Sequence, residues 1–111
     1  MITVKEIAWV AGIIEGEGCI RFNGTPKITI KMCDKDIIER LAKIFGKPVY
    51  SHLSNNKIYS SQYAVYVTSV SAVEWMFTVY SFLGIRKRKQ VDDAIRRWLP
   101  QKFHRNRLQL T

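Results

Sequence analysis

The sequence predicts a single α+β domain in which helices and pairs of strands follow one another in the order αββαββα. The prediction rests on stretches with apolar residues three and four apart, which alternate with stretches where apolar residues recur at every second position. Turn-forming residues separate these stretches, among them Asn23-Gly24 and Gly46. The chain has 111 residues, 47% of them hydrophobic, which suits one domain with a small core.

The charge of the chain is strongly positive, with 18 Lys and Arg against nine Asp and Glu and a net charge of +9. This balance indicates a polyanionic partner, either nucleic acid or an anionic membrane surface. We expect no membrane partner, because the cations lie on a strand face and at a helix start and not along an amphipathic helix. The sequence has no apolar run of bilayer-spanning length and no signal-peptide layout, which predicts a soluble intracellular protein. Cys19 and Cys33 are isolated and are expected to be reduced thiols.

The first helix is expected from about Val4 to Glu15, with Thr3 as its N-cap. Small side chains along it would let a second helix approach almost backbone to backbone. By the i, i+3, i+4 rule, one face of this helix holds Ala8, Ala11, Gly12 and Glu15.

Two carboxylates stand at the expected end of this helix, where Gly16 and Gly18 allow unusual backbone angles. At a helix C-terminus Glu15 and Glu17 oppose the macrodipole and gain nothing in stability from that placement. A second such helix alongside would gather like charges, which is costly unless a cation lies between them.

An antiparallel ribbon from Cys19 to Met32 follows, with a turn at Asn23-Gly24. One of its faces is apolar. The other carries three cations and no acid, which favours nucleic-acid contact over an ordinary solvated face. The residues expected to bind DNA there are Arg21, Lys27, Thr29 and Lys31.

Asp34 or Asp36 can cap a second helix, whose apolar stripe between Ile37 and Phe45 predicts core packing before Gly46 ends it.

A second ribbon is expected from Val49 to Leu53 and from about Tyr59 to Ser69, around a polar loop at 54–57. Aromatic and amide groups on its outward face suit contacts with base edges and sugars, although ordinary surface polarity explains any one of them equally well. These groups belong to Tyr50, His52, Gln62, Tyr66 and Thr68.

The last third of the chain predicts two helices. Ser71 to Glu74 fits a capping box that opens a helix reaching Gly84. The basic run from Arg86 to Gln90 then leads into a helix that Pro100 should end. Residues 1–100 are expected to form the domain, and 101–111 a basic, loosely held tail.

The stretch from Val10 to Gly18, VAGIIEGEG, resembles the LAGLIDADG signature of homing endonucleases, with valine for leucine and glutamate for both aspartates. The order of elements is similar to one LAGLIDADG core domain, and the basic run at Arg86 resembles the family's lysine-bearing segment. The resemblance implies a four-stranded antiparallel saddle sheet with helices on one face. Since the chain has one signature, it also implies a homodimer on palindromic or nearly palindromic double-stranded DNA.

The resemblance assigns roles to the two carboxylates. Glu17 stands at the acid that ligates Mg²⁺ (or Mn²⁺), with help from the Gly16 carbonyl, and oxygen ligands are those that Mg²⁺ prefers. Glu15 stands at the acid concerned with the helix end and, with Ala8, Ala11 and Gly12, with the dimer interface.

Three further residues are expected near the reacting phosphate or the DNA. Lys87 is expected to stabilise developing charge or position the attacking water, with Lys89 as the alternative and as a further DNA contact. Asp34 stands where family members carry a water-positioning polar group, and a helix cap explains it equally well.

The function implied is a homodimeric, Mg²⁺-dependent, site-specific endonuclease that cuts both DNA strands. The alternative is a nucleic-acid-binding protein of the same fold that does not cut, such as an RNA maturase that aids splicing. The carboxylates and the lysine favour the nuclease, because a pure binder has no need for acids facing phosphate.

Overall fold

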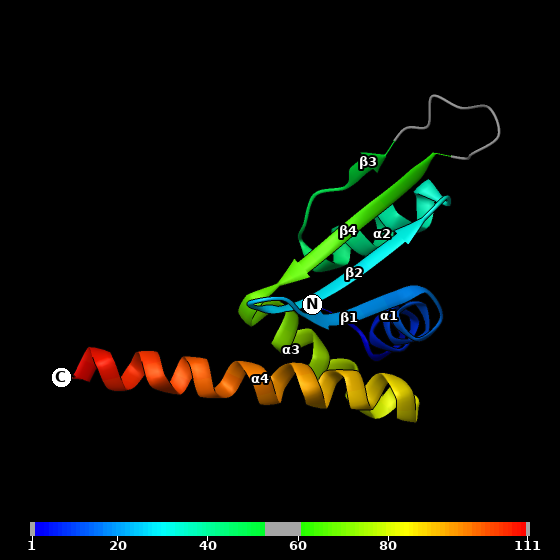
Figure 1. Cartoon of the computed structure of the whole chain (residues 1–111). Helices are drawn as coiled ribbons and strands as arrows, with labels where there is room; N and C mark the ends of the chain where they lie inside the picture. Colours follow the sequence, from blue (N-terminus) through cyan, green and yellow to red (C-terminus); the bar gives the residue numbers. More distant parts are fainter. Residues whose placement is uncertain (1, 53–60, 111) are drawn as a thin grey trace.

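The computed structural model describes residues 2–52 and 61–110, with side chains up to residue 100. The predicted polar loop at 54–57 and the predicted start of the second ribbon's long strand at Tyr59 lie outside these residues. The elements confirm the predicted α+β class and the order αββαββα, followed by a short 3₁₀ helix and a long helix (Figure 1). In chain order they are α1 (Val4–Glu17), β1 (Gly18–Phe22), β2 (Pro26–Met32), α2 (Lys35–Phe45), β3 (Tyr50–His52), β4 (Gln62–Thr68), α3 (Ser69–Val79), η1 (Tyr80–Phe82) and α4 (Ile85–Leu110).

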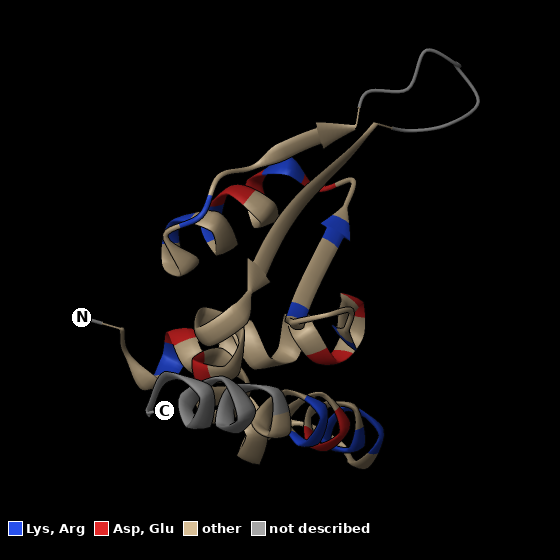
Figure 2. Cartoon of the chain, turned by 60° about the vertical axis from the view of Figure 1, so that its left-hand side comes forward, with Lys and Arg blue, Asp and Glu red and all other residues tan. Residues whose placement is uncertain are grey.

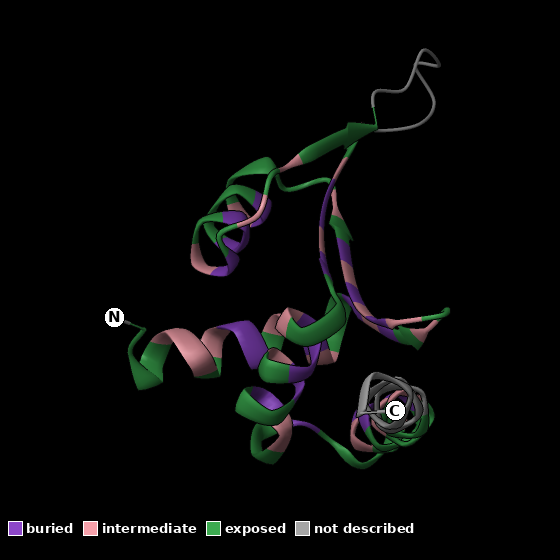
Figure 3. Ribbon diagram, turned by 90° about the vertical axis from the view of Figure 1, so that its left-hand side faces the viewer, coloured by how far each residue is buried: buried purple, intermediate pink, exposed green. Residues whose placement is uncertain are grey.

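The four strands form one antiparallel sheet in the order β1-β2-β4-β3. Helices α2 and α3 pack against β2 and β4, and α4 packs against β1. Figure 3 shows the sheet edge-on as a curved band, with helices gathered on one side. The predicted saddle sheet with helices on one face is therefore confirmed.

The core lies between the sheet and the helices, as the alternation of apolar residues predicts. Alternate residues of β1, β2 and β4 point into it, and Figure 3 shows alternating burial along the strands. The fully buried side chains include Ile28, Ile30, Val65 and Val67 from the sheet, with Ile14, Ile38, Leu41, Met76 and Val91 from the helices. The polar residues between them are thereby directed to the opposite face of the sheet.

The first helix has the predicted N-cap but ends two residues later than predicted. Thr3 and Glu6 form a capping box, in which the Glu6 N–H donates to Thr3 Oγ1 at 3.1 Å. At the other end, Gly16 is helical, and Gly18 has an ordinary extended conformation with φ −80°. A Cβ on Gly18 would lie 2.7 Å from the Ile14 carbonyl oxygen, so glycine is required there for space and not for an unusual backbone angle.

The turns around the first ribbon and α2 follow the prediction. Gly24 has φ +73° in the turn between β1 and β2, and Gly46 has φ +67° at the end of α2. Asp34 occupies the N-cap position of α2, but its side chain makes no capping hydrogen bond. The carboxylate of Asp34 is therefore exposed and not engaged by the helix.

The second half of the chain departs from the predicted boundaries. α3 begins at Ser69, before the predicted capping box, because Ser69 takes a φ of 59° and turns the chain directly from β4 into the helix. It ends at Val79, where η1 begins. The basic run lies inside the first turns of α4 and does not precede that helix.

Helix α4 continues through Pro100 to Leu110, so the predicted helix end at Pro100 is wrong. Proline removes one helical N–H, which costs about 3 kcal/mol in a helix interior but does not forbid continuation. Pro100 and Arg96 are both exposed, so water can satisfy the carbonyl that loses its partner. Within the described residues, no helix combines the length and the apolar character needed to cross a membrane.

Candidate nucleic-acid interface and metal centre

The face of the sheet opposite the core gathers the residues predicted to contact DNA. Strand pairing sets Arg21 opposite Lys27, Thr29 opposite Tyr66, and Lys27 opposite Thr68. Directly opposed residues in an antiparallel sheet project to the same face. On β3 and β4, His52 is opposite Gln62, and Tyr50 is opposite Ala64. Figure 2 shows the cations of β2 on this sheet and those of α4 at its first turns.

A hollow of about 360 Å³ on this face brings Glu17 together with the cations. The hollow begins at the end of α1 and extends across β1, β2 and β4. Its lining residues are Glu17, Cys19, Arg21, Lys27, Thr29, Lys31 and Tyr66. The structure thus places the carboxylate predicted to bind metal beside the residues predicted to bind the phosphate backbone.

Tyr66 is the centre of a group of contacts on the sheet face. The Lys27 ammonium lies 4.8 Å from the centroid of the Tyr66 ring, and the Tyr50 ring centroid lies 5.4 Å from it. The Tyr66 hydroxyl is 3.4 Å from Nε2 of His52. The sequence placed Tyr50, His52 and Tyr66 on one outward face but did not predict Lys27 beside them, because the pairing of β2 with β4 is not visible in either strand alone.

Cys19 is a member of the hollow that sequence reasoning treated only as a reduced thiol. Its sulfur accepts a hydrogen bond from Nε of Arg21 at 2.9 Å. The signal that could have found it is its position two residues before Arg21, which places both side chains on the same face of β1.

Glu17 is the last residue of α1 and is exposed to the hollow. Among the described residues, no ion pair or hydrogen bond engages its carboxylate, and no group of three or more His, Cys, Asp or Glu stands together. The donors available here are the Glu17 carboxylate and the exposed backbone of Gly16. These oxygen donors fit Mg²⁺ chemically, and one copy of the chain supplies only part of a six-ligand shell.

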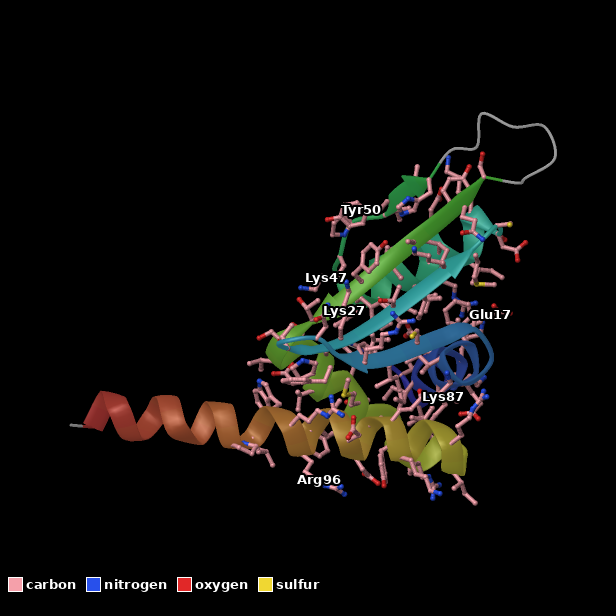
Figure 4. All side chains as sticks on the ribbon, in the orientation of Figure 1. Glu17, Lys27, Lys47, Tyr50, Lys87 and Arg96 are labelled. Atoms are coloured by element: carbon pink, nitrogen blue, oxygen red, sulfur yellow. The ribbon has the colours of Figure 1, made fainter. Side chains whose placement is uncertain are left out.

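Lys87 contacts Gly18, the residue that follows Glu17, but it does not line the hollow. Its side chain is buried, with 7% of the residue exposed, and Nζ donates to the Gly18 carbonyl at 2.5 Å. Figure 4 shows Glu17 and Lys87 at the same end of the molecule. Lys89 is exposed on α4 and does not line the hollow either. The geometry therefore distinguishes the two lysines that the sequence left as alternatives.

Asp34 is exposed just beyond the end of β2. Since Gly18 pairs with Ile30, the end of β2 lies beside the start of β1. Asp34 and Glu17 therefore belong to the same end of the β1–β2 ribbon.

The four residues expected at a dimer interface do not share one exposed face. Ala8 and Gly12 are exposed, and a Cβ on Gly12 would have no neighbour within 4 Å. Ala11 is only 1% exposed and packs in the chain's own core. Glu15 is half-buried, and its Oε2 accepts a hydrogen bond from the Gly84 N–H at 3.0 Å. The small residues of this helix thus fall into two groups. Ala11 packs within the chain, whereas Ala8 and Gly12 lie on an exposed surface.

Comparison with known proteins identifies similar structures. No family model matches the chain, and no curated protein matches it in sequence. The homing endonuclease I-CvuI, in complex with an I-CreI target in the presence of Mg with the DNA not cleaved, has a TM-score of 0.59 at 17% identity. I-CvuI in complex with its own target in the presence of Ca has a TM-score of 0.56 at 19% identity. The archaeal intron-encoded homing endonuclease I-Vdi141I, complexed with DNA, has a TM-score of 0.57 at 16% identity.

These matches cover most of this chain and a smaller share of the larger proteins. They cover 79%, 79% and 78% of this chain, but only 62%, 62% and 63% of those chains. At such low identity the likeness concerns the arrangement of elements. The chain has the fold of the LAGLIDADG homing endonucleases, the family that its signature stretch resembles.

Proposed function

We propose that this chain is a homodimeric, Mg²⁺-dependent endonuclease that cuts both strands of a palindromic or nearly palindromic DNA. The observation that carries the proposal is the hollow in which Glu17 meets Arg21, Lys27 and Lys31. An exposed carboxylate next to three cations suits a metal-assisted reaction on a bound phosphate. The three similar solved structures described above are DNA complexes, which supports the same partner.

The sheet face is suited to double-stranded DNA. Its cations can neutralise backbone phosphates, which fixes position and orientation without reading sequence. The cluster around Tyr66 offers aromatic rings, a hydroxyl and an imidazole, which can contact sugars and base edges. Cations and polar aromatic groups therefore occur on one surface, where positioning and sequence readout can act together.

Glu17, with the Gly16 carbonyl, would hold the metal. When bound, Mg²⁺ supplies charge stabilisation at the scissile phosphate and a more acidic water. Lys31 lines the same hollow and would bind the DNA backbone beside that site. Lys87 adds a buried positive charge at Gly18, the residue that follows Glu17, and holds the carbonyl of Gly18 in place.

A second copy would complete the site. Ala8, Gly12 and Gly16 recur four residues apart along the exposed side of α1, where they allow a partner helix to approach closely. Such contact would bring a second Glu17 near the first. A closed two-fold dimer presents the same surface twice, which is why we expect a palindromic target.

A nucleic-acid-binding protein that does not cut, such as an RNA maturase, is the second candidate. It is favoured by the burial of Lys87, which keeps its ammonium out of the hollow.

Selection from a randomised DNA library tests the proposal and separates the two functions. Cleaved products should appear with Mg²⁺ and not with Ca²⁺, and their sequences give the target. With that target, Glu17→Gln should lower the cleavage rate by at least about a hundredfold, because the metal loses a charged ligand. Binding in Ca²⁺ should stay within a few-fold, because the sheet face is unchanged.

Glu74→Gln is the matched control, since it removes an equivalent charge from an exposed position on α3. It should leave both cleavage and binding unchanged. Parental cleavage by Glu17→Gln would refute the metal site, and binding without any products in Mg²⁺ would favour the second candidate.

A further inference from the structure

The position of Glu15 is electrostatically unfavourable within its own helix. It lies in the last turn of α1, where a carboxylate opposes the macrodipole and where no basic residue compensates it. Its Oε2 nevertheless accepts a hydrogen bond from the backbone N–H of Gly84, 3.0 Å away. Gly84 directly precedes α4, so the carboxylate lies at the positive end of that helix's dipole.

The start of α4 lacks an anion of its own. Its first turn contains no acidic residue and carries Arg86, Lys87 and Arg88 instead. Cations at a helix N-terminus oppose the dipole, and the first N–H groups have no partner inside the helix. Glu15 therefore supplies from α1 both the negative charge and the acceptor that α4 does not provide itself.

A second contact joins the same two segments. Lys87 Nζ donates to the Gly18 carbonyl. Lys87 is three residues after Gly84, and Gly18 is three residues after Glu15. Each pair is separated by 69 residues of sequence. We call these two contacts the clamp. Glu17 lies between the two residues that α1 and β1 contribute to it.

We propose that Glu15 is a positioning residue that fixes the start of α4 and thereby keeps the Lys87 ammonium against Gly18, beside Glu17. Gly84 takes part in the clamp, because a Cβ there would lie 2.8 Å from Glu15 Oε1. Only the effect on cutting rests on the proposed function, since the clamp joins the folded chain whether or not the protein cleaves DNA.

The reactivity of Lys87 towards an amine-acetylating reagent tests the clamp. The folded full chain is treated with N-hydroxysuccinimidyl acetate, and acetylation rates at Lys87 and Lys89 are measured by mass spectrometry. In the parent, buried Lys87 should react far more slowly than exposed Lys89. Glu15→Ala should raise the Lys87 rate by about tenfold, the scale of losing one hydrogen bond to a charged group, and leave Lys89 unchanged.

Three further variants make the result specific. Glu74→Ala removes an exposed carboxylate from α3 and should change neither rate. Glu15→Gln keeps an acceptor oxygen for Gly84 and should restore most of the protection of Lys87. Gly84→Ala displaces the carboxylate without altering Glu15, so it decides the question even if Glu15→Ala does not fold.

Equal Lys87 rates in the parent, Glu15→Ala and Gly84→Ala would overturn the proposal. A parallel rise at Lys89 would overturn it as well, because it would indicate general loosening of α4. If the parent cuts DNA, Glu15→Ala should lower kcat by about tenfold with KM within about twofold, and Glu15→Gln should recover most of the loss. If the parent does not cut, the proposed function fails while the labelling result still decides on the clamp.

Discussion

The dependence of DNA binding on salt should report how many cations of the sheet face touch phosphate. Each copy presents Arg21, Lys27 and Lys31 in the hollow, so a dimer presents six. At about 0.9 per neutralised phosphate, log K against log[salt] should have a slope of about −5.4. Raising KCl from 50 to 200 mM should then weaken binding by about a thousandfold. A single bound copy would give a slope of only about −2.7.

Two variants locate the effect on the sheet. Lys31→Ala removes one cation per copy and should reduce the slope to about −3.6. Lys43→Ala removes the same charge from α2, on the helical side of the sheet, and should leave the slope unchanged. Fluorescence anisotropy with labelled duplex DNA in EDTA measures both without competition from divalent ions. A flat salt dependence, or equal changes in the two variants, would refute the assignment of this face to DNA.

Three more outcomes follow from the backbone and side-chain geometry. Gly12→Leu should weaken dimerisation without unfolding the chain, because a Cβ at Gly12 would have no neighbour within 4 Å. Sedimentation that shows the parent to be a stable monomer at micromolar concentration would contradict the dimer. Gly18→Ala should lower the free energy of unfolding by about 1–3 kcal/mol through overpacking, whereas Gly16→Ala, inside α1 with open space, should raise it slightly; urea titration measures both. Tyr80 donates to Asp92 at 3.0 Å, and this hydrogen bond raises the pKa of Tyr80 above its usual 10.0. The protonated phenol is the stabilised form, so its contribution is complete below pH 10 and is lost as pH rises through the raised pKa. The difference in stability between the parent and Tyr80→Phe should therefore shrink above pH 10, and a constant difference would contradict this.

The sheet face and the core could be predicted from the sequence because a strand alternates its sides at every residue. Spacing alone was enough to assign Arg21, Lys27 and Lys31 to one face. Helix ends were predicted well where a left-handed glycine fixes them, as at Gly46, and poorly where the backbone of a neighbour decides. Gly18 is such a case. A side chain there would collide with the Ile14 carbonyl, whereas the backbone angles of Gly18 would allow one.

The parts of the candidate site that were missed depend on contacts between distant segments. Lys87 was expected near phosphate, and its burial against Gly18 follows from the packing of α4 on β1, which no local pattern encodes. The hydrogen bond between Glu15 and Gly84 was not predicted, because it joins residues that are 69 positions apart in the sequence. The continuation of α4 through Pro100 was missed because proline destabilises a helix without always ending it. At an exposed position of a long helix, the loss of one hydrogen bond can be tolerated.

The alternation of sides along β1 and β2 has a consequence for how such a protein can change its target. Residues that meet the hollow, such as Arg21 and Thr29, are interleaved one for one with core residues such as Ile20 and Ile28. On the proposed function, substitutions in the first set would alter what is recognised, while the second set continues to hold the domain together. The residues of the hollow and those of the core can therefore be substituted independently on the same few strands. A single substitution in the hollow can then give a new specificity without an earlier gain in the stability of the domain.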